Sequence, residues 1–105
     1  MNLLVMEKHE GEGVFPLFKK GTAVSDFNAC DEYPNWFSCM INGYKTYIPG
    51  IYVVDSVLIQ DYNPTELVVK KDQTVTLINI VFEWLYVKDE NDRRGWIPAS
   101  KVVSI

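Results

Sequence analysis

The chain has 105 residues, of which 48% are hydrophobic and 13% aromatic, with a formal net charge of −4 and a pI near 4.8. This apolar content is ample for a packed core and argues against a disordered chain. The acidic balance argues against a nucleic-acid-binding surface, because phosphate contacts need clustered Lys and Arg. Basic residues adjoin one another only in the pairs Lys19-Lys20, Lys70-Lys71 and Arg93-Arg94.

The first residues do not read as a targeting segment. Met1 to Met6 are mostly apolar, but charged residues from Glu7 to Glu10 interrupt them before a signal-peptide core could form. No apolar run reaches the length of a membrane-spanning helix. We therefore expect a cytoplasmic protein, unless a signal segment has been removed. Without an export signal, Cys30 and Cys39 are expected to be free thiols.

The first third of the chain predicts two strands separated by a long loop. β-compatible residues in Leu3–Lys8 precede a Gly-rich turn at Gly11–Gly13, which is typical of an opening strand. Phe15–Phe18 should end the loop with its apolar side chains turned inward, and Pro16 favours an edge or a strand start. Thr22–Phe27 predicts the second strand.

A hairpin is predicted next, after a polar loop from Asn28 to Asn35. Trp36–Ile41 is rich in large apolar residues and predicts a strand, and Tyr44–Ile48 predicts its partner. Asn42-Gly43 between them is a strong signal for a two-residue type I′ turn, whose two central residues both need positive φ.

The rest of the chain predicts further strands. Val53–Gln60 contains no Gly/Ser-rich linker. Thr74–Val81 is nearly continuous in β-branched and apolar residues, and Trp84–Lys88 and Arg94–Pro98 flank a polar turn at Asp89–Asp92. No stretch shows a helical period with caps, so the fold class is all-β.

The chain repeats itself at offsets of 48 to 51 residues. The matching segments are Lys19–Val24 with Lys70–Val75, Trp36–Cys39 with Trp84–Val87, and Tyr47–Val53 with Trp96–Val102. We therefore expect two domains, residues 1–54 and 55–105. The short connection between them predicts a fixed relative orientation.

Four segments of the second repeat, taken in order, resemble a Src-homology-3 (SH3) domain of the bacterial or variant type. They are the ALYDY-like Leu58–Tyr62, the acidic and apolar Glu66–Asp72, the pair Trp84-Leu85, and the closing Gly95–Val102. The resemblance implies two tandem SH3-like β-barrels. It also implies a short 3₁₀ turn at Pro49–Tyr52, before the last strand of the first barrel.

Members of this family bind polyproline II peptides in a shallow groove of tyrosines, a tryptophan and a proline. The residues at those positions are Trp36, Pro49 and Tyr52 in the first repeat, and Tyr62, Trp84 and Pro98 in the second. Neither set is complete, because Glu7, His9, Gln60 and Lys101 stand where the family has tyrosines. The alternative is that Trp36 and Trp84 only cover their barrels.

Other conspicuous residues have simpler interpretations. His9, the single histidine, matches Tyr62 in the repeat and is expected in a surface loop. Cys39 matches Val87, which predicts a small buried side chain, and Trp96 is expected to pack within or between the barrels. The acidic turn residues Asp89, Glu90 and Asp92 are expected to be solvated rather than to bind a cation.

Catalytic and metal-binding motifs are missing from the sequence. There is no Cys-His pair with an orienting group, no Ser nucleophile motif and no Gly-rich phosphate loop. One histidine and two unclustered cysteines give no metal site. No enzyme activity and no cofactor are therefore expected.

The sequence predicts a non-enzymatic module that binds a protein or peptide, through a composite surface built from both barrels. It predicts no nucleic-acid partner and no insertion into a membrane. Two alternatives stay open. One is binding of wall peptides in a cell envelope, and the other is a structural or regulatory subunit of a larger assembly, with self-association possible.

Overall fold

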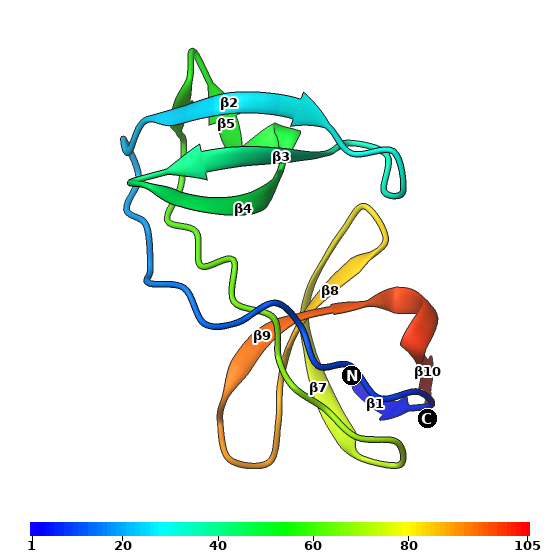
Figure 1. Ribbon diagram of the computed structural model, residues 1–105. Helices are drawn as coiled ribbons and strands as arrows, with labels where there is room; N and C mark the ends of the chain where they lie inside the picture. The colour runs from blue at the N-terminus through cyan, green and yellow to red at the C-terminus, as the bar shows by residue number, and fades with distance from the viewer. The chain divides into compact units, whose positions relative to one another are not determined.

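The computed structural model describes all 105 residues, Met1 to Ile105. Strands and two short 3₁₀ helices make up its regular structure, and it contains no α-helix, so the predicted all-β class is confirmed (Figure 1). None of its helices has the length and hydropathy needed to span a membrane. The chain forms two compact units: unit 1 contains Met1–Val14 and Thr65–Ile105, and unit 2 contains Phe15–Pro64.

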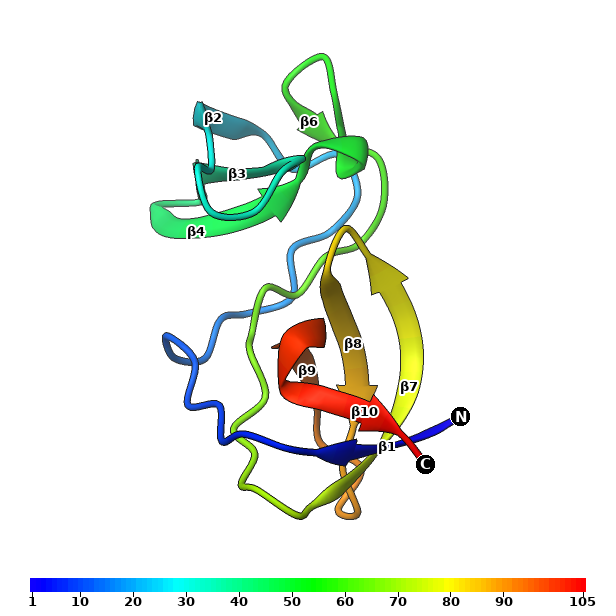
Figure 2. The same ribbon diagram turned by 90° about the vertical axis from the view of Figure 1, so that its right-hand side faces the viewer.

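Unit 1 contains a five-stranded antiparallel sheet in the order β10-β1-β7-β8-β9. Its elements are β1 (Asn2–Val5), β7 (Thr74–Val81), β8 (Trp84–Lys88), β9 (Arg94–Pro98), the 3₁₀ helix η2 (Ala99–Lys101) and β10 (Val102–Ser104). The first strand lies inside the sheet, where Leu3 is opposite Ser104 on one side and Val75 on the other. Figure 2 shows β1 beside β10 and the two chain ends close together.

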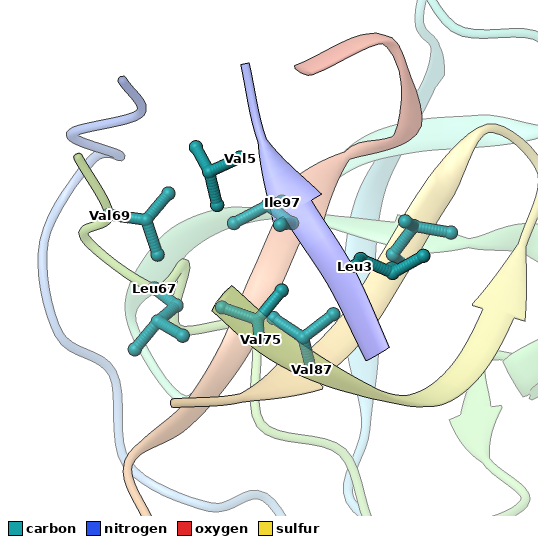
Figure 3. Packing of buried hydrophobic residues seen from close by; sticks show 8 residues of the cluster. Leu3, Val5, Leu67, Val69, Val75, Val87 and Ile97 are labelled. Carbon is teal, nitrogen blue, oxygen red and sulfur yellow. The ribbon is translucent and has the colours of Figure 1, made fainter. Parts of the chain in front are cut away.

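The core of unit 1 joins both of its chain segments (Figure 3). Leu3 and Val5 alternate inward from β1, as the period of a strand requires, and both are at most 5% exposed. The other core residues are Leu67, Val69, Val75, Leu85, Val87 and Ile97. Burying one such side chain contributes about 1.5 to 3 kcal/mol, so the first residues are an integral part of this unit.

Unit 2 contains a three-stranded sheet, β2-β3-β4, and a two-stranded pair, β5-β6. Its elements are β2 (Val24–Ala29), β3 (Trp36–Ile41), β4 (Tyr44–Pro49), the 3₁₀ helix η1 (Gly50–Tyr52), β5 (Val53–Val54) and β6 (Val57–Leu58). Asn42 and Gly43 have φ of 49° and 82°, so the predicted turn between β3 and β4 is confirmed. The predicted 3₁₀ turn is confirmed as η1.

The two units do not coincide with the predicted division into residues 1–54 and 55–105. Val54 pairs with Val57 across a two-residue turn, Asp55-Ser56, in which both residues have positive φ (52° and 64°). Such a turn holds its flanking strands side by side, so β6 stays in unit 2. The expected boundary therefore falls inside a hairpin, and residues 1–14 join the second repeat instead.

Each unit consequently takes its opening strand from the other repeat. Val5 in unit 1 and Leu58 in unit 2 make the same pair of main-chain hydrogen bonds to equivalent positions. The bonds are Val5 N to Gln73 O (2.9 Å) and Asp72 N to Val5 O (2.8 Å), and Leu58 N to Thr22 O (2.9 Å) and Gly21 N to Leu58 O (2.8 Å). The two units therefore share this hydrogen-bond pattern, and in each unit the opening strand comes from the other half of the chain.

Candidate functional site

Four of the six predicted groove residues lie together in unit 2. Trp36 and Pro49 are opposite each other on β3 and β4, Tyr52 is in η1, and Tyr62 follows β6. Tyr62 was expected to act with Trp84 and Pro98, but those two residues are in unit 1. The exchange of opening strands thus places Tyr62, from the second repeat, in the same unit as Trp36 and Tyr52.

This aromatic cluster is packed rather than open. Trp36, Tyr52 and Tyr62 are only 4 to 6% exposed. The rings of Tyr52 and Tyr62 meet edge to face at 5.5 Å, and the Tyr62 hydroxyl donates a hydrogen bond to the Tyr47 carbonyl oxygen (2.6 Å). Burial raises the pKa of Tyr52, and a side-chain hydrogen bond with Gln60 partly offsets this effect. Trp36, Tyr52 and Tyr62 are therefore part of the core of unit 2.

In unit 1, Trp84 is the one partly exposed residue among the six candidates, since Pro98 is buried. Trp84 is opposite Pro98 in the register of β8 and β9. The imidazole of His9 approaches the Trp84 ring edge-on, with ring centroids 5.8 Å apart and planes at 74°. The indole of Trp84, the ring of Pro98 and the imidazole of His9 therefore lie together in unit 1.

A polar chain of Glu66, His9 and Lys101 supports this position. His9 is 8% exposed, so the expectation of a surface loop is wrong. Its Nε2 is 2.6 Å from Glu66 Oε1, and Lys101 Nζ is 3.1 Å from its Nδ1. A lysine ammonium can only donate, so Nδ1 accepts and Nε2–H donates to the carboxylate. His9 is also fixed by its backbone, which exchanges two 2.9 Å hydrogen bonds with Val69.

The contrast between the two units follows from the exchanged strands. Within the repeat, His9 is equivalent to Tyr62, and Lys101 is equivalent to Tyr52. The exchange brings the two polar residues together in unit 1 and the two tyrosines together in unit 2. Glu66, which sequence reasoning left out of the site, completes the polar set. The short spacing from Val54 to Val57 was the signal that could have revealed this pairing.

The remaining predicted residues have structural roles. Trp96 is 5% exposed and packs against Tyr86 at 5.1 Å, in agreement with its expected packing role. Cys30 and Cys39 are free, and Cys39 is buried, as its match with Val87 predicted. Burial raises the pKa of the Cys39 thiol to about 11. No group of three or more His, Cys, Asp or Glu side chains is arranged to hold a metal ion.

Asp89 departs from the expected solvated turn, because its side chain is only 2% exposed. Its Oδ1 accepts hydrogen bonds from the backbone N–H groups of Asn91 (2.9 Å) and Arg93 (3.0 Å), and its Oδ2 accepts one from Arg93 Nε (2.9 Å). The carboxylate thus organises the turn between β8 and β9. Desolvation alone would raise the pKa of Asp89, but these hydrogen bonds outweigh it and hold the pKa below its ordinary value.

Comparison with known proteins supports the resemblance for the second repeat. Residues 57–105 match the family model of the variant SH3 domain. The chain matches no curated protein and no solved structure at a significant level. The matched stretch runs from β6 in unit 2 through β10 in unit 1. Residues 57–105 are therefore similar to an SH3-type domain, a class of domain that generally acts as a non-catalytic interaction module.

Proposed function

We propose that this chain is a non-enzymatic interaction module that binds an extended peptide of a partner protein through Trp84 in unit 1. The match of residues 57–105 to the variant SH3 family supports binding as the general function. The observation that carries the site is the partial exposure of Trp84 at the family's groove position, beside His9 and Pro98. The predicted role of Trp36, Pro49, Tyr52 and Tyr62 in a composite surface remains a prediction.

Trp84 is suited to be the anchor of such a site. Tryptophan offers a large rigid surface at low entropic cost, and truncating an anchoring tryptophan commonly costs 2 kcal/mol or more of binding free energy. The edge-on imidazole and the proline opposite restrict where the indole can move. A proline or another apolar residue of an extended peptide can pack on the part of the ring that is open to solvent.

The polar chain behind Trp84 has a positioning role in this proposal. Glu66 and Lys101 each hold one nitrogen of the His9 ring, so the ring has one orientation toward the indole. Lys101 is itself partly exposed and also donates to the Lys8 carbonyl oxygen (3.2 Å). Tyrosines at positions 9 and 101 would have given the groove aromatic walls. The imidazole of His9 and the ammonium group of Lys101 stand there instead.

The test is a screen of the full chain against an array of proline-rich and other extended peptides, followed by titration of the peptides that bind. Trp84→Ala should weaken binding by about 30-fold or more, the equivalent of 2 kcal/mol. Tyr47→Ala is the matched control, because Tyr47 is 41% exposed in unit 2 and the substitution keeps the main-chain carbonyl that accepts the Tyr62 hydrogen bond. It should leave the affinity unchanged.

Equal affinity of wild type and a folded Trp84→Ala variant would reject Trp84 as the anchor. Failure of every peptide to bind, together with Trp84-dependent sedimentation of the chain with insoluble envelope material, would instead support the wall-peptide alternative. Circular dichroism of each variant separates lost binding from lost folding.

A further inference from the structure

The first strand of unit 1 is far in sequence from the other strands of that unit, yet it lies inside the sheet. β1 fills a slot between β7 and β10 and is hydrogen-bonded on both sides. The segment continues to His9, which pairs with Val69. The hydrogen-bond partners of these residues, from Asn2 to His9, come from residues 65–105. The slot is thus a complete binding site for residues 1–9.

The connection of this segment to the rest of the chain has the features of a hinge. Residues 10–14 form no strand, and Val14 is 87% exposed. Gly11 and Gly13 have φ of 72° and 112°, and no atom lies within 4 Å of the position a Cβ would take at Gly13. Gly11 packs closely against Glu66, but around Gly13 and Val14 little packing fixes the path of the chain, so the chain can change direction there at low cost.

We propose that the slot between β7 and β10 is a strand-acceptor site that also takes residues 1–9 of a second copy of this chain, giving a dimer with reciprocally exchanged N-terminal strands. The incoming segment has the same sequence, so every hydrogen bond and buried side chain of unit 1 is reproduced. Only the path of the hinge differs between monomer and dimer. Their ratio is therefore set by chain concentration and hinge length.

The buried polar chain makes this slot selective for its own segment. His9 needs an acceptor and a donor, and Glu66 and Lys101 in unit 1 supply them. Unit 2 offers no equivalent, because Tyr52 stands at the position of Lys101 and the slot is already filled by β6, held there by the Asp55-Ser56 turn. An incoming N-terminal segment therefore fits unit 1 and not unit 2.

Disulfide trapping reports which chain supplies the strand. Asn2 and Thr76 are register partners on β1 and β7, and Thr76 Oγ1 is 3.3 Å from Asn2 Oδ1. Val5 N bonds to Gln73 O and Leu77 N to Met1 O, so Asn2 and Thr76 form the closer, non-hydrogen-bonded kind of pair. Asn2→Cys/Thr76→Cys, in a background of Cys30→Ser and Cys39→Val, is refolded at low and high concentration and oxidised. Non-reducing gels then separate bonds within a chain from bonds between chains.

The proposal expects bonds within one chain at low concentration and bonds between two chains at high concentration. Deleting Glu12 and Gly13 should increase the dimer about tenfold at equal concentration, because a shorter hinge strains the closed form. A flexible insertion at Gly13 should decrease it. Bonds only within one chain at every concentration, in the original hinge and in the shortened one, would overturn the proposal. A dimer by light scattering that lacks bonds between chains would also overturn it, since another surface would then be responsible.

Discussion

The imidazole of His9 lies 2.6 Å from the carboxylate of Glu66, although 57 positions separate the two residues in the sequence. The contact exists because residues 1–14 join unit 1 and not the unit formed by the residues that follow them. It buries a hydrogen-bonded polar pair, with side chains 10% and 15% exposed, beside the candidate binding residue Trp84. This contact fixes the imidazole that lies beside the candidate binding residue.

Glu66→Ala should destabilise the protein by about 1 to 3 kcal/mol, because it leaves the Nε2–H of a buried imidazole without an acceptor. Glu66→Gln keeps an acceptor oxygen and should cost less. Urea unfolding followed by tryptophan fluorescence measures both, with Glu10→Ala as the control for an exposed carboxylate. Equal midpoints for Glu66→Ala and wild type would show that this hydrogen bond does not stabilise the fold.

Gly95 is in β9, where a side chain has no room. An added Cβ would lie 2.5 Å from the backbone nitrogen of Leu67 and 2.9 Å from its Cα. Backbone atoms cannot move aside as a flexible side chain can, so Gly95→Ala should cost about 1 to 3 kcal/mol. Thermal unfolding of this variant, beside the exposed substitution Ser104→Ala, measures the effect. A melting temperature within error of wild type would contradict the close approach of the two segments.

The two possible divisions of the chain predict different autonomous fragments. Residues 15–64 contain every strand of unit 2, so this fragment should fold by itself, with marginal stability for its size. Residues 1–54 lack β6 and should not show cooperative unfolding. Amide dispersion in NMR spectra of both fragments is the measurement. Folding of residues 1–54 but not of 15–64 would restore the division at residue 54.

Local signals explain why the strands could be predicted but the units could not. The turn at Asn42-Gly43 and the β-branched run Thr74–Val81 are readable within a few residues, and both were predicted correctly. Which strand enters which unit depends on pairing across more than fifty residues. The turn at Asp55-Ser56 keeps β6 in unit 2, and this dipeptide is a weaker turn signal than Asn-Gly. His9 was misplaced for the same reason, since its partners lie 57 and 92 positions away.

The two thiols should differ strongly in reactivity. Cys39 is 2% exposed and burial raises its pKa to about 11, so at neutral pH it is almost entirely protonated and inaccessible. Cys30 is partly exposed and should react first with a chromogenic disulfide reagent. One thiol per chain should react in the native state and two after unfolding. Rapid labelling of Cys39 in the folded protein would contradict its burial.

The Asp89 carboxylate predicts a defined dependence of stability on pH. Its pKa in the folded state is below the ordinary value of 3.8, so its contribution is fully present above that value and is lost as the pH falls through the folded-state pKa. Because Arg93 is 64% exposed and its charge is screened, we expect Asp89→Asn to cost only about 1 kcal/mol at pH 7. The difference from wild type should shrink as the pH falls through the folded-state pKa, below which both side chains are neutral. Asp92→Asn is the control, because that side chain is 86% exposed, and it should show no such loss. A constant difference between Asp89→Asn and wild type from pH 7 to pH 2 would mean that the charge of Asp89 does not stabilise the turn.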